Sequence, residues 1–370
     1  MVSKVSGLGI SLVRESTSHI TTSCADAYDQ AQFARPAGTI ADLDDPRAAE
    51  GVAAWVRRGS VLGVHAAGNH PSLHASWIEA LALGYRVAVR PSRREPFTPY
   101  RLISALRAAG FGTDQVVLLP TDHDAADEMM RGCDRSMVYG GEDVIRKYEN
   151  RPNILAQGPG RSKMLITAGG DWENHLDLIT DSVSKNAGVS CTNTTAIFVE
   201  GDARALAHAL AQRLEALPTL SILNNDAGLP VQAAETARAL EAYLRAAAEG
   251  TTPILGEAGI VEELGDGSAV LRPAVHLLPD PLSRQANIEL PFPCVWIAPW
   301  TREAGIAPLK QTLALTVLTD DEQLVRDLLA EPTIRNVYSG PYPTFWNAPG
   351  VPHDGYLADF LMESKGFIRS

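Results

Sequence analysis

Short apolar runs alternate with segments of helical periodicity along most of the chain. Between residues 61 and 167, runs of strand length are separated by segments whose apolar residues recur every three or four positions. The runs lie at 61–66, 85–89, 116–120, 136–139 and 164–167, and the helical segments at 72–83, 98–106, 122–131 and 141–149. Strands alternating with helices of this length indicate an α/β fold with a parallel sheet covered on both faces.

The alternation continues in the second half of the chain. It predicts helices at 171–185, 202–217, 232–248 and 321–330, and strands at 195–200, 253–256, 269–276 and 294–298. The first 44 residues are polar and irregular, which favours an arm or edge strands, and Asp45-Pro46 predicts a helix that ends at Gly59. A boundary near residue 160 predicts one domain at 1–160, a second at 161–340, and a loop and tail at 341–370.

Composition narrows the class of protein. The 370 residues carry a net charge of -12, which argues against a nucleic-acid-binding surface. No apolar run reaches 18 residues, so no membrane span is expected, and the N-terminus lacks the apolar segment of a signal peptide. The cysteines are far apart and form no C-x-x-C pair, so we expect neither disulfides nor a metal site, and a cytoplasmic location fits best. They are Cys24, Cys133, Cys191 and Cys294.

Cys191 lies in N-A-G-V-S-C-T-N (186–193), a glycine-containing link between a predicted helix and a predicted strand. A nucleophile needs such a position, because a tight turn exposes the side chain next to main-chain N–H groups. The local sequence leaves a second interpretation open, since a cysteine that is not catalytic is most often a small buried apolar residue.

Five segments in register resemble motifs of the aldehyde dehydrogenase superfamily. N-A-G-V-S-C-T resembles its N-x-G-x-x-C-T, and G-N-H-P (68–71) resembles its W-N-x-P. V-R-P-S (89–92) resembles V-K-P-S, Tyr139-Gly140-Gly141 resembles T-G-S, and E-L-P-F-P (289–293) resembles E-x-F-G-P. The resemblance implies a Rossmann-type cofactor domain at 1–160, an α/β catalytic domain at 161–340 and an oligomerising extension, with the C-terminal tail a candidate for that role.

The resemblance also implies roles for two residues. Cys191 would attack an acyl carbonyl, and the Asn69 amide with the Cys191 main-chain N–H would hold the oxygen that becomes negative. Preorganised donors of this kind are worth about 3–4 kcal/mol each. The alternative for Asn69 is an ordinary turn residue before Pro71.

One departure from the family pattern sets the expected direction of the reaction. Where aldehyde-oxidising members carry the Glu of E-L-G-G-K, which activates the hydrolytic water, this chain has A-Q-G-P-G-R-S-K (156–163) with Gln157. An amide is no general base near neutral pH, so hydrolysis of an acyl-enzyme should be slow. The segment, together with I-E-L-P-F-P-C-V-W, is similar to the acyl-CoA reductase branch, which includes the fatty-acyl reductase of bacterial luminescence. That resemblance implies reduction of an activated acyl group to an aldehyde.

NADPH is the expected cofactor. The resemblance places Arg90 and Ser92 at the adenosine ribose, Glu289 at the nicotinamide ribose, and Gly140 and Gly141 where a helix start approaches the pyrophosphate. Arg93 stands where NAD-preferring members often have Glu, and arginine can bind a 2′-phosphate in bidentate fashion. A solvated basic turn is the alternative for this arginine cluster.

The acyl donor stays open between acyl-CoA, acyl-adenylate and acyl-protein. No P-loop signature is present, so any activation of a free acid requires a separate ligase as partner. A homo-oligomer is expected from the resemblance. Two alternatives remain: an acyl-phosphate reductase of the semialdehyde dehydrogenase type, and a cysteine acyltransferase or scaffold subunit without redox activity.

Overall fold

The computed structural model describes residues 1–122 and 124–370, which form two compact units. Residues 15–158 and 348–370 make up the unit that we call the Asn69 unit. Residues 1–14 and 159–347 make up the Cys191 unit. The division after Gly158 lies close to the expected boundary, but residues 1–14 group with the Cys191 unit, and residues 348–370 return to the Asn69 unit.

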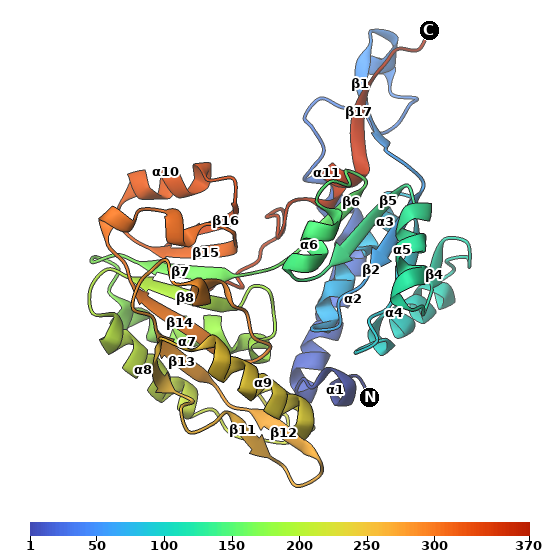
Figure 1. Ribbon diagram of the computed structural model, residues 1–370. Coiled ribbons are helices and arrows are strands. Elements are labelled where there is room, and N and C mark those ends of the chain that lie inside the picture. The colour runs from blue at the N-terminus through green and yellow to red at the C-terminus, as the bar shows by residue number, and fades with distance from the viewer. The chain divides into compact units, whose positions relative to one another are not determined.

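A five-stranded parallel sheet forms the centre of the Asn69 unit (Figure 1). The strand order is β4-β3-β2-β5-β6, and every neighbouring pair is parallel. The strands are β2 (Val61–His65), β3 (Arg86–Arg90), β4 (Val116–Leu118), β5 (Arg135–Tyr139) and β6 (Ile154–Gln157).

Helices cover both faces of this sheet. One apolar cluster joins it to α2 (Ile10–Gln32), α3 (Ile78–Ala82), α4 (Phe97–Ala108) and α11 (Leu357–Leu361), and another joins it to α5 (His123–Gly132) and α6 (Glu142–Tyr148). A separate two-stranded arm pairs β1 (Val52–Arg57) antiparallel with β17 (Met362–Phe367). The arm joins segments from near the two ends of the chain (Figure 1).

The Cys191 unit is built on a seven-stranded sheet with the order β10-β13-β14-β8-β7-β15-β16. All pairs are parallel except β10 with β13. The strands are β7 (Ser162–Ile166), β8 (Thr194–Val199), β10 (Thr252–Leu255), β13 (Ala274–Leu277), β14 (Cys294–Pro299), β15 (Thr312–Leu318) and β16 (Ile334–Ser339). A small antiparallel sheet is formed by β9 (Val231–Ala233), β11 (Val261–Glu263) and β12 (Ser268–Leu271).

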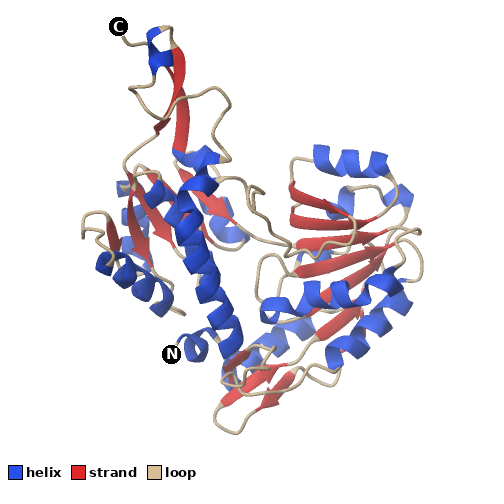
Figure 2. Cartoon of the chain, turned by 180° about the vertical axis from the view of Figure 1, so that it is seen from behind, coloured by secondary structure: helices blue, strands red, loops and turns tan.

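Two helical layers enclose this sheet, as Figure 2 shows from behind. On one face lie α7 (Leu176–Ser184) and α8 (Ala203–Glu215), and on the other lie α9 (Ala234–Ala247) and α10 (Glu322–Ala330). Leu206, Leu210 and Leu214 of α8 are fully buried, as their spacing predicts. Each such side chain stabilises the fold by roughly 1.5–3 kcal/mol.

The remaining helices are short. The first element of the chain is α1 (Val2–Ser6). The 3₁₀ turns are η1 (Pro46–Ala49), η2 (Pro71–Ala75), η3 (Trp172–His175), η4 (Lys185–Gly188), η5 (Arg284–Asn287), η6 (Arg302–Ala304) and η7 (Ala307–Leu309).

Several local expectations were wrong. The segment 1–44 is mainly helix α2, whose buried face includes the small residues Ala27 and Ala31, so its periodicity carries little hydrophobic signal. The helix expected at 45–59 is a single turn, because Gly51 takes a left-handed conformation (φ 88°) and the chain then enters β1. The strand expected at 269–276 is two strands, β12 and β13, interrupted around Pro273.

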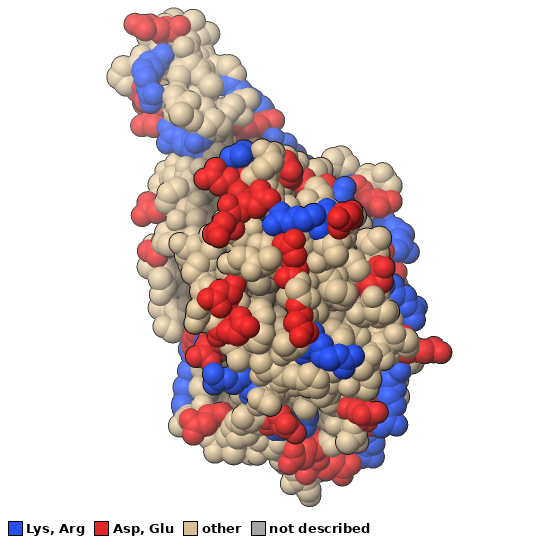
Figure 3. Space-filling view, turned by 90° about the vertical axis from the view of Figure 1, so that its left-hand side faces the viewer, with Lys and Arg blue, Asp and Glu red and all other residues tan. Residues whose placement is uncertain are grey.

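Charged side chains of both signs are scattered over the face shown in Figure 3. Lysines and arginines are interspersed there with carboxylates. Among the described residues, no helix is long and apolar enough to cross a membrane.

Candidate active site

The Cys191 loop connects η4 to β8 and has an unusual backbone. Asn186, Ala187 and Gly188 all have positive φ (55°, 59° and 68°), so three successive residues are left-handed. Glycine is required at the third position, because a Cβ on Gly188 would lie 2.4 Å from the nitrogen of Pro293. The segment E-L-P-F-P therefore packs directly against the chain before Cys191.

Gly160 and Ser162 support the main chain of Cys191 itself. A Cβ on Gly160 would lie 2.1 Å from the Cys191 carbonyl oxygen, so the two backbones are in direct contact. The Ser162 hydroxyl donates to the same oxygen at 2.9 Å, and Ser162 is fully buried at the start of β7. The peptide that follows Cys191 is thus held in one orientation.

Glu289 reaches the same turn. Its two carboxylate oxygens accept the main-chain N–H groups of Gly160 (3.1 Å) and Arg161 (2.8 Å). Gly160 therefore joins Glu289 and Cys191 into one cluster within the Cys191 unit. The side chain of Glu289 is nevertheless exposed, so a ribose hydroxyl can compete for its oxygens.

The other thiols are poor nucleophiles. Burial raises the pKa of Cys24, Cys133 and Cys294, which disfavours the thiolate. Cys294 is 7% exposed in the core of the sheet, where it packs as a small apolar residue. Cys191 is half-buried on its loop and belongs to no core cluster among the described residues.

Asn69 lies in the link between β2 and η2 of the Asn69 unit. The preceding residue, Gly68, packs against the next turn, since a Cβ there would lie 2.3 Å from the Ser92 hydroxyl. Ser92 accepts the main-chain N–H of Arg94 at 3.2 Å. The structure thus brings the Asn69 turn and the Ser92 turn together at the carboxyl edge of the sheet.

The three arginines of this region differ in exposure. Arg90 is only 2% exposed, and its guanidinium bonds to His65 Nε2 at 2.9 Å and to the Thr121 carbonyl at 3.2 Å. Its Nε and the Thr121 hydroxyl are buried without a partner among the described residues. Arg93 and Arg94 are exposed, so a phosphate from solvent would meet these two first.

Gly140 and Gly141 precede α6. Gly140 donates its N–H to the Gln157 carbonyl at 3.1 Å, and the space around Gly141 is open. The first turn of α6, however, carries the exposed carboxylates Glu142 and Asp143. These carboxylates neutralise the positive potential at the start of the helix, so the helix start offers open space at Gly141 but no strong attraction for an anion.

Comparison with known proteins agrees with this architecture. The model of the aldehyde dehydrogenase family matches residues 27–349. The chain belongs to the aldehyde dehydrogenase family. The NAD-dependent aldehyde dehydrogenase from Sinorhizobium meliloti superposes on 99% of this chain and 76% of its own, with a TM-score of 0.81 and 19% identity. The expected fold, an aldehyde dehydrogenase fold with a parallel sheet, is confirmed.

Two curated relatives match a smaller part of the chain. The 2-hydroxymuconic semialdehyde dehydrogenase of Pseudomonas sp. (strain CF600) is 26% identical over 293 residues, which are 72% of this chain and 58% of that protein. A probable methylmalonate-semialdehyde/malonate-semialdehyde dehydrogenase [acylating] of Drosophila melanogaster is 26% identical over 202 residues, 50% of this chain and 38% of that protein. The chain thus spans less than two thirds of the length of these relatives.

The residues predicted for this aldehyde dehydrogenase site fall into two groups, one in each unit. Cys191 and Glu289 meet around Gly160, while the residues of the other group occupy the edge of the five-stranded sheet. That group comprises Asn69, Arg90, Ser92, Arg93, Gly140 and Gly141. Sequence reasoning missed Ser162 and Asn193, because small polar residues beside a motif give no signal until their partners are known.

Lys163, next to Ser162, was also missed. It is fully buried, and its Nζ donates to the carbonyls of Pro308 (3.1 Å) and Lys310 (2.7 Å). Burial lowers the pKa of Lys163 to about 7, and Arg161 acts in the same direction while Glu289 opposes it. Through these hydrogen bonds the lysine connects β7, whose first residue Ser162 bonds to Cys191, with the segment around η7.

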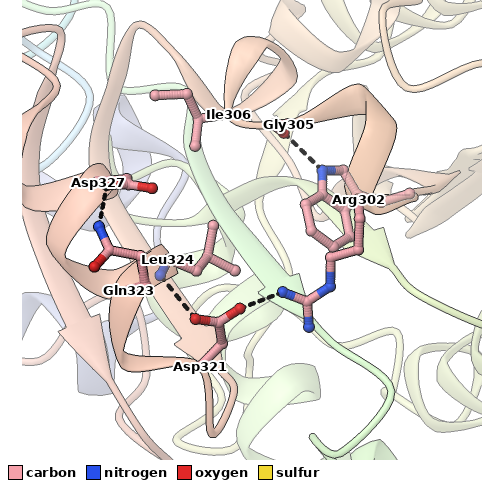
Figure 4. Close-up of a pocket in the computed structure, with 8 residues that line it drawn as sticks. Arg302, Gly305, Ile306, Asp321, Gln323, Leu324 and Asp327 are labelled. Atoms are coloured by element: carbon pink, nitrogen blue, oxygen red, sulfur yellow. Dashed lines mark hydrogen bonds and ion pairs between the residues drawn. The ribbon is translucent and has the colours of Figure 1, made fainter.

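A pocket of about 410 Å³ opens at the carboxyl ends of the strands of the seven-stranded sheet (Figure 4). Arg302 connects two of the loops at these strand ends. It donates to Glu200 at 3.0 Å and to Asp321 at 2.6 Å, and its guanidinium lies over the Trp300 ring. Glu200 follows the carboxyl end of β8, whereas Cys191 precedes its amino end. The pocket of this family member is therefore separate from the cysteine site.

His74 in η2 gives the Asn69 unit an acid-sensitive point. It is 2% exposed, and Trp77 Nε1 donates to its Nδ1 at 3.2 Å, which requires an unprotonated Nδ1. Burial lowers the pKa of His74 to about 4. Because the folded pKa lies below the unfolded value of about 6.5, the stabilisation is complete above pH 6.5 and is lost as pH falls towards 4.

We expect the free energy of unfolding of wild type to fall by on the order of 2–3 kcal/mol more than that of His74→Gln between pH 7 and pH 4. Denaturant titration at both pH values, followed by tryptophan fluorescence, measures the difference. The glutamine variant keeps an acceptor for Trp77 but cannot titrate. Identical pH dependence in the two proteins would show that His74 is not the acid-sensitive group.

Proposed function

We propose that this chain is an oxidoreductase that reduces an activated acyl group to an aldehyde with NADPH, through a thioester on Cys191. The observation that carries the proposal is Gln157, at the end of β6, where hydrolytic members of the family have the glutamate that activates water. A carboxamide cannot take a proton from water near neutral pH, so the acyl-enzyme persists until hydride arrives. The name of the Drosophila relative, which includes the word acylating, supports acyl exchange in place of hydrolysis.

The reaction has two parts. The Cys191 thiolate attacks the acyl carbonyl carbon, the new C–S bond forms, and the donor thiolate of an acyl-CoA leaves. Hydride, the chemistry that NADPH supplies when bound, then reduces the thioester carbon, and the C–S bond breaks to release the aldehyde and regenerate the thiolate. The main-chain N–H of Cys191 stabilises the oxygen that is negative at both stages, and the Asn69 amide stays a predicted second donor to that oxygen.

The cofactor assignment follows from the exposed arginines. Arg93 presents a guanidinium to solvent at the Ser92 turn and is suited to a 2′-phosphate. The Arg90 guanidinium bonds to His65 and Thr121 and so stabilises the turn. Its Nε, which has no partner among the described residues, is the atom proposed to donate to the adenosine ribose. Gly141 leaves room for the pyrophosphate, and Gly140 lets the turn pack closely against Val144, since a Cβ there would lie 2.5 Å from the Val144 Cβ. Glu289 is the partner for the nicotinamide ribose.

The proposal implies an activated donor made elsewhere. Acyl-CoA, acyl-adenylate and acyl-protein all present a carbonyl with a good leaving group, and a ligase of another chain would supply them. A cytoplasmic location and a homo-oligomeric assembly complete the proposal.

The test is turnover of NADPH with a panel of acyl-CoAs in the presence of a carbonyl trap. Wild type should consume NADPH and yield trapped aldehyde, with a lower KM for NADPH than for NADH. Arg93→Glu should raise the KM for NADPH by at least about tenfold, because a carboxylate repels the 2′-phosphate, while the KM for NADH changes little. A stable adduct on Cys191 without turnover would support the acyltransferase alternative, and neither adduct nor turnover would refute the catalytic assignment.

A further inference from the structure

Asn193, two residues after Cys191, makes an unusual number of hydrogen bonds. It is 6% exposed, and its Nδ2 donates to the carbonyls of Lys185 (2.8 Å), Ser182 (3.2 Å) and Val183 (3.4 Å). Its Oδ1 accepts the main-chain N–H of Ser190 at 2.9 Å. One side chain thus satisfies carbonyls at the C-terminus of α7 and also holds the residue immediately before Cys191.

The main chain of Asn193 completes the clamp. Its N–H donates to the Ser190 carbonyl at 2.9 Å, closing a turn with Cys191 and Thr192 at its centre. The Ser190 carbonyl and the Cys191 N–H belong to one planar trans peptide, so they point in opposite directions. Fixing the carbonyl towards Asn193 therefore fixes the direction of the Cys191 N–H.

The backbone before the clamp needs such support. The left-handed residues Asn186 and Ala187 each cost of order 1–3 kcal/mol, and such conformations persist only where surrounding contacts over-determine them. Asn193 bonds to residues on both sides of this run, Lys185 before it and Ser190 after it. On the C-terminal side, the Ser162 hydroxyl holds the carbonyl of Cys191 itself.

We propose that Asn193 is a positioning residue that fixes the Cys191 main-chain N–H towards the substrate oxygen. The role rests on the proposed function of Cys191 as nucleophile. A donor contributes to transition-state stabilisation only when it points to the oxygen before the reaction begins, so a loosened turn lowers kcat more than it weakens cofactor binding.

Asn193→Ala tests this role, with Gln285→Ala as the matched control. Gln285 is also a buried carboxamide, and it donates to the carbonyls of Ala247 and Glu249 at and just after the end of α9. Among the described residues, these hydrogen bonds do not involve the Cys191 loop. Asn193→Ala should lower kcat by about 10- to 100-fold and change the KM for NADPH by less than about threefold. Gln285→Ala should lower the melting temperature comparably and leave kcat within about twofold of wild type.

Amide hydrogen exchange of residues 186–193 provides a readout that does not need turnover. It should be about tenfold faster in Asn193→Ala and unchanged in Gln285→Ala. Asn193→Ser keeps a hydroxyl for one of the lost bonds and should fall between wild type and alanine; it is the variant to measure if alanine does not fold. Unchanged exchange, or a folded Asn193 variant with wild-type kcat, would overturn the role.

The two proposals fail in different ways. Wild-type protein without turnover on any donor refutes the proposed function and the catalytic part of this inference, while the exchange rates still decide whether Asn193 holds the loop. Wild-type turnover with equal kcat losses in the Asn193 and Gln285 variants refutes only the positioning role.

Discussion

Cys191→Ala should abolish acyl-dependent oxidation of NADPH, with a loss of at least about 10⁴-fold, and should also abolish the covalent acyl adduct. In the proposed reaction both signals depend on the same thiol, because the C–S bond forms before hydride is transferred. Binding of NADPH should persist, since the arginine cluster lies in the Asn69 unit. Stopped assays for aldehyde, intact-protein mass for the adduct and fluorescence titration for NADPH measure the three quantities.

Cys133→Ala is the matched control for this variant. Cys133 is also a half-buried thiol, but burial raises its pKa and it lies at the end of α5, away from the Cys191 loop in the sequence and in a different unit. It should retain turnover within about twofold and a melting temperature within a few degrees of wild type. Residual turnover in Cys191→Ala above the background of the assay would mean that another group is the nucleophile.

The alternating pattern of the chain predicted an α/β fold with a parallel sheet and most of its helices. It did not show that the strands divide into a five-stranded and a seven-stranded sheet, or that β10 pairs antiparallel in the latter. It failed where tertiary contacts carry the structure. Helix α2 was missed because part of its buried face consists of alanine, and β15 and β16 were missed although β15 is buried along its whole length. Thr312 and Thr316 interrupt the apolar residues of β15, so this strand forms neither a continuous apolar run nor a strict alternation.

The candidate site shows the same division. Asn186 and Gly188 are residue types that tolerate left-handed conformations, so the motif around Cys191 has a direct physical explanation in the backbone. Arg90 and Arg93 are chemically alike in the sequence, yet one is buried against His65 and the other is exposed. That difference depends on His65 at the end of β2 and on Thr121 after β4, which local sequence reasoning could not place beside Arg90.

The loop around Cys191 is held from several directions at once. The Ser162 hydroxyl holds the carbonyl of Cys191, and Asn193 holds the peptide between Ser190 and Cys191. The backbone of Gly160 packs directly against the backbone of Cys191. Gly160 cannot move freely either, because its N–H is bonded to Glu289 and its carbonyl accepts the N–H of Leu313 at 2.8 Å. Any atom added at Gly160 must therefore displace Cys191 or break this network.

Gly160→Ala should consequently lower kcat by about 100-fold or more and destabilise the fold by about 1–3 kcal/mol. The new Cβ would lie 2.1 Å from the Cys191 carbonyl oxygen and 2.7 Å from its Cα, distances that no rotamer change relieves because both partners are backbone. Gly228→Ala is the control in the same unit, since a Cβ there meets nothing within 4 Å and its φ is not positive. Steady-state kinetics and thermal unfolding of both variants measure the effect, and a folded Gly160→Ala protein with wild-type kcat would contradict the close packing of the β7 turn against Cys191. The two effects can be compared as free energies. If the increase in activation free energy exceeds the decrease in the free energy of unfolding, Gly160 acts like Asn193, as a residue that positions the reacting thiol.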